Sequence, residues 1–216
     1  MQNVLPFLKK LQANNNKEWF EANRTLYTKA KEEFESFVQD IISGIRKFDS
    51  KIEDLQAKQC IFRINRDVRF SKDKSPYKNN MGASINPGGK KSLEAGYYLH
   101  VQPEESFLAG GIYMPLPDKL AAIRQEIDYH PEPLLKILKL ESFKKYFNGL
   151  DEEDKLKNAP KGYDNAHKHV ELLKNKHFTV SYKLSNNDLT DPKIKTTIVS
   201  GFKAMHPFLE YLRNAT

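Results

Sequence analysis

The sequence predicts an α+β fold: a single domain over residues 1–216, with a mainly antiparallel sheet flanked by helices, a long N-terminal helix and a C-terminal helix. Two observations lead to this prediction. Apolar residues recur at helical spacing before residue 50 and after residue 117, whereas between these limits they alternate with polar residues. Helices, then hairpin-like strands, then helices favour an antiparallel sheet, because parallel sheets come from alternating strands and helices. The chain also has no Gly-rich nucleotide-binding loop that would favour the parallel alternative.

Near the N-terminus, a short helix is predicted over residues 4–12 and a long amphipathic helix over residues 16–48. Asn16 is placed to cap the long helix, because its side chain can accept a hydrogen bond from the first turn. The apolar stripe of this helix starts with three aromatic residues that we expect to pack on the sheet: Trp19, Phe20 and Tyr27.

The middle of the chain carries most of the strand patterns. The segments with such patterns are residues 61–70, 81–86, 97–102, 107–114 and, later, 177–184. The third and fourth segments are separated by only four residues, which predicts an antiparallel hairpin. Gly110 and Gly111 inside the fourth segment predict a bulge or a close approach of another backbone.

Helical patterns return after the hairpin. Helices are predicted over residues 118–128, 131–139, 142–147 and 164–173. A last helix is expected to start at Asp191-Pro192, with Asp as the N-cap, and to kink or break near Pro207.

Composition limits the cellular context. With 39% hydrophobic residues in 216, the chain can bury a substantial core. Its single cysteine, Cys60, is expected to be buried and excludes an internal disulfide, so we expect a cytoplasmic protein. No apolar run approaches the roughly 20 residues of a membrane span, and the first residues do not resemble a signal peptide. We therefore expect no membrane partner.

Positive charge is concentrated in residues 58–91, which contain nine Lys or Arg and two Asp. This excess of seven equals the net charge of the whole chain, so the remaining residues balance to zero. Such clustering favours an anionic partner for this segment.

Arg66 is the most informative residue of the basic segment. On a strand it would share the apolar face of Ile64 and Val68, so we expect its side chain inside or at the margin of the core. A guanidinium group does not lose its proton, so it must meet a carboxylate, carbonyl groups or a bound anion. One interpretation is a structural ion pair with a distant acid: Glu94, Glu126 or Asp128.

The functional interpretation is a cradle for phosphate or carboxylate, made by Arg66 with Lys74, Tyr77 and Lys78. On the strand face opposite to Arg66, Arg63 and Arg69 lie on either side of Asp67, and we expect them to pair with it. The same charges, with nearby aromatic residues, could instead form a nucleic-acid surface. Aromatic residues at strand spacing usually fill a core, so this interpretation is the weaker one.

Catalytic and metal-binding patterns are weak. His167 and Asp164 beside Lys161 could supply acid/base chemistry, although helix capping explains them equally well. His167 and His169 would diverge by about 200 degrees on a helix, so we expect no metal site. The sequence identifies no cofactor.

Several motifs together resemble a known family. The central one is Phe62-Arg63-Ile64-x-Arg66-Asp67-Val68-Arg69-Phe70-Ser71-Lys72-Asp73-Lys74-x-Pro76-Tyr77-Lys78. The others are Asn15-x-x-x-Trp19-Phe20, Gly110-Gly111-x-Tyr113-x-Pro115, Pro160-Lys161-Gly162-Tyr163 and Glu171-Leu172-Leu173-Lys174-x-Lys176-x-Phe178. This pattern resembles the uncharacterised family catalogued as domain of unknown function 2461. The resemblance implies a single α+β domain and no particular activity.

Our leading hypothesis is a protein that binds a phosphate-bearing or other anionic small molecule in a basic pocket. Lys161, Tyr163 and His167 are further candidates for the cleft that would contain the basic segment. The alternatives are a nucleic-acid-binding module and an enzyme with acid/base residues near His167. The sequence leaves open the identity of the ligand, its turnover and the oligomeric state.

Overall fold

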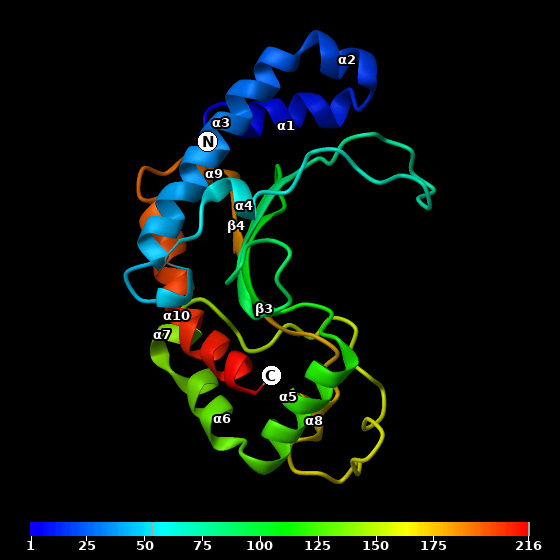
Figure 1. The fold of residues 1–216 in the computed structure, drawn as a ribbon, viewed down its shortest axis with the longest axis vertical. Helices are drawn as coiled ribbons and strands as arrows, with labels where there is room; N and C mark the ends of the chain where they lie inside the picture. Colours follow the sequence, from blue (N-terminus) through cyan, green and yellow to red (C-terminus); the bar gives the residue numbers. More distant parts are fainter. Residues whose placement is uncertain (53, 216) are drawn as a thin grey trace. The chain divides into compact units, whose positions relative to one another are not determined.

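The computed structural model describes residues 1–52 and 54–215 and confirms the α+β class (Figure 1). Over these residues, helices form most of the regular structure, and four strands form one antiparallel sheet in the order β1-β2-β3-β4. The strands are β1 (Met81–Ile85), β2 (Gly96–Val101), β3 (Ser106–Ile112) and β4 (Phe178–Leu184). All four coincide with predicted strands to within two residues.

The chain divides into two compact units. Unit 1 comprises Met1–Ser92, Tyr98–Leu108 and Lys183–Ser200. Unit 2 comprises Leu93–Tyr97, Ala109–Tyr182 and Gly201–Thr216. Strands β2, β3 and β4 each contribute residues to both units.

Unit 1 begins with the helices α1 (Val4–Ala13), α2 (Lys17–Ala22) and α3 (Arg24–Ile45). Asn16 caps α2 as predicted, because its Oδ1 accepts the N–H of Trp19 at 2.9 Å. The single long helix predicted over residues 16–48 is wrong, since Asn23 separates α2 from α3. The Asn23 side chain donates to the carbonyl of Trp19 at 2.9 Å, and such side-chain bonds compete with a continuous helix.

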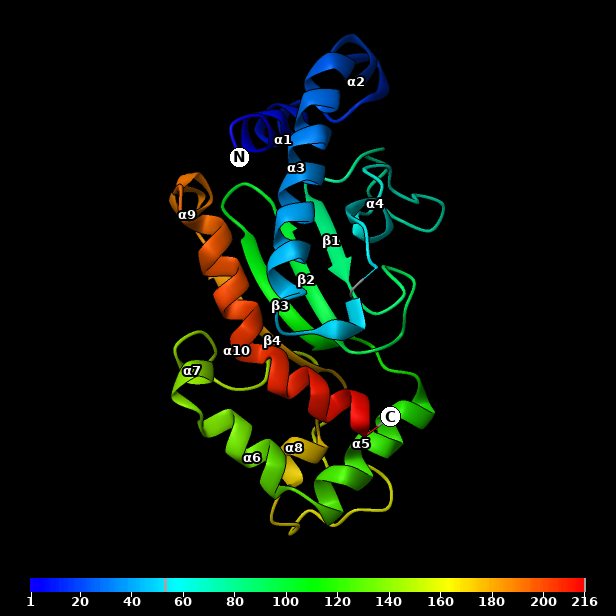
Figure 2. The same cartoon turned by 60° about the vertical axis from the view of Figure 1, so that its left-hand side comes forward.

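Helix α3 supplies much of the core of unit 1. Its buried stripe includes Phe34, Val38, Ile41 and Ile45, and the helix contacts α1, α2, α4 and β1. Figure 2 shows α3 running along the face of the sheet at β1. The short 3₁₀ helix η1 (Ser50–Ile52) and helix α4 (Ala57–Cys60) follow it. Cys60 is fully buried, as predicted, and burial raises the pKa of its thiol to about 12.

The predicted strand over residues 61–70 is wrong. Residues 61–80 form an extended loop, hereafter the basic loop. It makes two isolated bridges: Ile61 pairs with Ala83 of β1, and Asn65 pairs with Tyr77 within the loop. In Figure 1 the loop leaves α4, extends away from β1 and returns to it. Alternation of apolar and polar residues favours a strand, but a strand also needs a partner along its length.

The glycine prediction in β3 is confirmed. Gly111 has a φ of +131°, and a Cβ placed there would lie 1.9 Å from the carbonyl oxygen of Phe178 in β4. Only a residue without a side chain allows this approach of the two backbones.

In unit 2, helices α5 (Pro117–Tyr129), α6 (Glu132–Lys139) and α7 (Glu141–Lys144) match predicted helices, although α7 ends earlier. Helix α8 (Val170–Leu173) covers only the end of the helix predicted over residues 164–173. Helix α9 (Asn186–Thr190), in unit 1, was not predicted. Helix α10 (Ile194–Asn214) begins three residues after Asp191 and continues through Pro207, so the alternative of a break there is wrong. Among the described helices, none is both long and apolar enough to cross a membrane.

Candidate functional site

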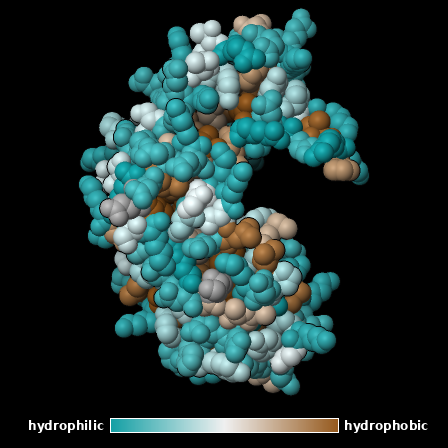
Figure 3. Space-filling model, in the orientation of Figure 1, coloured by the Kyte–Doolittle hydropathy of each residue, from teal (hydrophilic) through white to brown (hydrophobic). Residues whose placement is uncertain are grey.

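The basic loop contains six Lys or Arg and two Asp in residues 61–80, so it carries a net positive charge. At the upper right of Figure 3 its surface is mainly hydrophilic, with a few apolar side chains toward its end. The loop contains Phe70, whose exposed fraction is 96%. The loop is therefore a cationic surface that carries an exposed aromatic ring.

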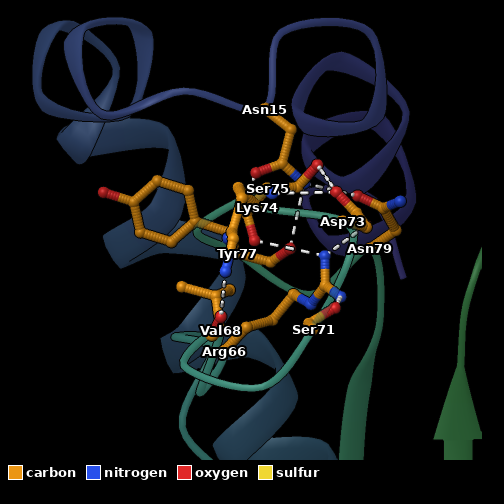
Figure 4. Close-up of polar contacts among 9 residues, drawn as sticks. All are labelled: Asn15, Arg66, Val68, Ser71, Asp73, Lys74, Ser75, Tyr77 and Asn79. Atoms are coloured by element: carbon orange, nitrogen blue, oxygen red, sulfur yellow. Dashed lines mark hydrogen bonds and ion pairs between the residues drawn. The ribbon is translucent and has the colours of Figure 1, made fainter.

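Arg66 lies at the centre of a polar network within the loop (Figure 4). Its Nη1 forms a short ion pair with the Asp73 carboxylate and donates to the carbonyl of Ser75 at 3.2 Å. Its Nη2 donates to the hydroxyl of Ser71 at 3.3 Å, and its side chain is 25% exposed. The predicted acid partners Glu94, Glu126 and Asp128 are wrong, because the loop folds back and brings Asp73 to Arg66 instead.

Asp73 receives three hydrogen-bond donors. Besides Arg66, the hydroxyl of Ser75 donates to its Oδ1 at 2.7 Å and the N–H of Ser75 donates at 2.8 Å. The Ser75 hydroxyl, the Ser75 N–H and the Arg66 guanidinium lower the pKa of Asp73 to about 2. The Asp73 side chain is nevertheless 61% exposed, so solvent reaches the carboxylate.

The second aspartate of the loop is also paired. Asp67 accepts two hydrogen bonds from the Arg69 side chain, at 3.0 and 2.6 Å, as the sequence predicted. The predicted pairing of Arg63 with Asp67 is wrong, since, among the described contacts of Asp67, Arg63 contributes only its charge, which, after the hydrogen bonds from Arg69, helps to lower the pKa of Asp67. The Arg69 guanidinium also lies 5.9 Å from the ring centroid of Phe70.

Lys74 and Lys78 connect distant parts of the loop. Lys74 Nζ donates to the carbonyl of Val68 at 3.0 Å, and Lys78 Nζ donates to the carbonyl of Arg63 at 3.0 Å. Burial and the charge of Arg63 lower the pKa of Lys78. Both ammonium groups therefore hold the loop's shape, in addition to supplying positive charge.

Tyr77 anchors the returning part of the loop to the N-terminal helices. Asn15 donates to the Tyr77 carbonyl at 2.9 Å and accepts the Tyr77 N–H at 3.1 Å, and it donates to Asn79 at 3.0 Å. The Tyr77 ring stacks on Phe20, with 4.0 Å between ring centroids. Tyr77 is buried, so it supports the loop and does not present its ring to a ligand.

The predicted packing of the aromatic stripe on the sheet is corrected by these contacts. Phe20 packs on Tyr77 of the basic loop and on Phe7 of α1, and Trp19 and Tyr27 also contact Phe7. No local pattern relates position 15 or 20 to position 77. The only signal of their role in the sequence is that both belong to motif segments.

The other predicted site residues, Lys161, Tyr163 and His167, belong to unit 2. The Tyr163 and His167 rings meet edge to face at 6.3 Å, and Lys161 is exposed. His167 and His169 precede α8, so their rings lie 6.0 Å apart and do not diverge as they would on a helix. That these residues share a cleft with the basic loop stays a prediction.

Both ring nitrogens of His167 are engaged. Nδ1 accepts the N–H of His169 at 3.1 Å, so the proton is on Nε2, which donates to Asp128 Oδ1 at 3.0 Å. A general base needs a free lone pair directed at its substrate. In this arrangement the imidazole joins the segment before α8 to α5.

A groove of about 480 Å³ lies elsewhere in unit 1. It is lined by Lys9, Gln12 and Ala13 of α1 with the turn that joins β2 to β3, residues 102–105. Lys9 pairs with Glu104 at 3.7 Å. No residue of the basic loop lines this groove.

One family model matches residues 3–211, which is nearly the whole chain. Its description is "conserved hypothetical protein (DUF2461)". No curated protein and no solved structure matches the chain.

Proposed function

The chain belongs to the DUF2461 family and, since the description of this family names no activity, we propose a function from the basic loop: it binds single-stranded nucleic acid. Exposed cations would contact the phosphates and Phe70 would stack on a base. The observation that carries the proposal is the Phe70 ring, 96% exposed on a cationic loop that is cross-linked by its own side chains. A cytoplasmic location is part of the proposal.

The exposure of Phe70 favours a binding role for this ring. Burying a Phe side chain contributes roughly 1.5–3 kcal/mol, yet this ring gains almost none of that from the fold. Stacking of a base on an aromatic ring contributes about 1–3 kcal/mol and is tolerant of sequence. The neighbouring Arg69 guanidinium can add a charged contact to the same base or to its phosphate.

The distribution of charge favours an extended ligand. Arg63, Arg69 and Lys72 are exposed, and Lys72 forms no ion pair with a described residue. The two aspartates would repel a phosphate backbone if they were unpaired. Each is instead paired with an arginine of the loop, Asp67 with Arg69 and Asp73 with Arg66.

The compact anionic ligand has weaker support. Its predicted cradle consists of Arg66, Lys74, Tyr77 and Lys78, and all four use their polar or aromatic groups in contacts within unit 1. An enzyme near His167 has weaker support too, because both nitrogens of that ring are engaged. Both alternatives stay predictions.

Fluorescence anisotropy with labelled oligonucleotides of increasing length tests the proposal. Affinity should rise with length and fall with salt. If Arg63 and Lys72 each neutralise one phosphate, the log–log slope should be roughly −1.4, from about −0.7 per phosphate. Phe70→Ala should weaken binding about tenfold, corresponding to roughly 1.4 kcal/mol of lost stacking.

Tyr129→Ala is the matched control, because it also removes an exposed aromatic ring, but in unit 2. It should leave affinity unchanged. Equal effects of Phe70→Ala and Tyr129→Ala, or an affinity independent of length and salt, would refute the proposal.

A further inference from the structure

We infer that Arg66 and Ser75 form an oxyanion site for a phosphate group, and that the chain's own Asp73 carboxylate occupies this site. The inference rests on the proposed function in one respect, that the ligand of the loop carries phosphate. It adds the position of a phosphate and an internal competitor for it.

The groups around the Asp73 carboxylate are those that bind phosphate oxygens in proteins. A guanidinium group, a backbone N–H and a hydroxyl group converge on two oxygens, from Arg66 and from Ser75 (Figure 4). A carboxylate and a phosphate present negatively charged oxygens to such donors in similar ways. Asp73 therefore stands in the place of an external anion.

The donors are held in position by contacts other than Asp73. The Arg66 side chain donates to the Ser75 carbonyl and to the Ser71 hydroxyl. The Arg66 backbone N–H donates to the Pro76 carbonyl at 2.9 Å. The adjoining Tyr77 backbone is bound by Asn15. The guanidinium and the Ser75 N–H should keep their places when the carboxylate turns away.

The carboxylate itself can leave without opening the fold. The Asp73 side chain is 61% exposed, whereas the Arg66 side chain is 25% exposed. Displacement exchanges one anion for another on the same donors, so the wild-type site should bind phosphate weakly. Removing the carboxylate should leave the Arg66 fork and the Ser75 donors for an external anion.

The test compares inorganic phosphate binding to wild type, Asp73→Asn and Asp67→Asn by isothermal titration calorimetry at constant ionic strength. Asp67→Asn is the matched control, because it removes the same charge from the same loop at the carboxylate paired with Arg69. We expect Asp73→Asn to lower the phosphate Kd at least tenfold and Asp67→Asn to lower it less than threefold. Arg66→Lys in the Asp73→Asn background should abolish the gain.

Equal changes in the two Asn variants would overturn the inference, because they would reflect only the overall charge of the loop. Circular dichroism checks the folding of each variant. If Asp73→Asn does not fold, wild-type NMR decides: saturating phosphate should shift the Arg66 guanidinium and Asp73 carboxyl signals together, and unchanged signals would overturn the inference. Phosphate binding without oligonucleotide binding would refute the proposed function and leave this site standing.

Discussion

The Asn15 carboxamide forms hydrogen bonds with both backbone polar groups of Tyr77, 62 residues away. Asn15 Nδ2 donates to the Tyr77 carbonyl at 2.9 Å, and the Tyr77 N–H donates to Asn15 Oδ1 at 3.1 Å. An adjacent strand would satisfy these groups in the same way. One side chain between α1 and α2 thus takes the place of a strand partner for the returning part of the basic loop.

Asn15→Ala should destabilise the protein by about 2 kcal/mol, because it leaves a partly buried N–H and C=O without their partners. Urea unfolding followed by circular dichroism measures this. Asn14→Ala is the control, since Asn14 is adjacent and its side chain makes only an exposed hydrogen bond, to the Lys10 carbonyl at 2.9 Å, so its change should stay within about 1 kcal/mol. Equal losses for the two variants would show that the contact with Tyr77 contributes nothing.

Phe20→Ala should cost roughly 3–5 kcal/mol, because Phe20 is 4% exposed and its loss leaves a cavity between α1, α3 and Tyr77. The loop contact makes a second effect testable: exchange of the Tyr77 amide should become faster in the variant. The exposed-ring variant Tyr129→Ala should change stability by less than about 0.5 kcal/mol. An unchanged melting temperature for Phe20→Ala would contradict the packing described here.

The contribution of Asp73 to stability should depend on acid pH. Its folded pKa is about 2, below the value of about 3.9 for an unfolded Asp. A lowered folded pKa stabilises the protein above pH ~4, and this stabilisation is lost as the pH falls toward 2. The difference in stability between wild type and Asp73→Asn should therefore shrink between pH 4 and pH 2, as measured by urea unfolding at each pH. A carboxyl midpoint near 4 in an NMR titration would contradict this prediction.

Gly111→Ala should destabilise the protein by about 3 kcal/mol or more, because the new Cβ would meet the Phe178 backbone. Gly162→Ala is the control, because it introduces backbone strain without a clash. Gly162 also has a positive φ, +95°, but an added Cβ there meets nothing within 4 Å, so we expect only about 1–2 kcal/mol. Thermal or urea unfolding measures both, and equal losses would show that the approach of β3 to β4 tolerates a side chain.

The fold class and most elements could be predicted from local patterns. The helical stripe of α3, the cap at Asn16 and the hairpin of β2 and β3 depend on residues close together in the sequence. The pairing of Asp67 with Arg69 is local in the same sense. The close approach of another backbone at Gly111 could be predicted from the sequence, although the identity of that backbone could not.

The tertiary structure decided how the basic segment is used. Its alternation predicted a strand, yet only isolated bridges form, because strand formation depends on a partner that periodicity does not specify. Arg66 needed an anion by its chemistry alone, but that the anion is Asp73 depends on the path by which the loop returns. The sequence by itself determined the charge, the amphipathic faces and the requirement for partners. The partners of Arg66, Phe20 and Tyr77 depended on chain reversals and long-range packing, since contacts between distant residues are specified by the whole fold and not by local spacing.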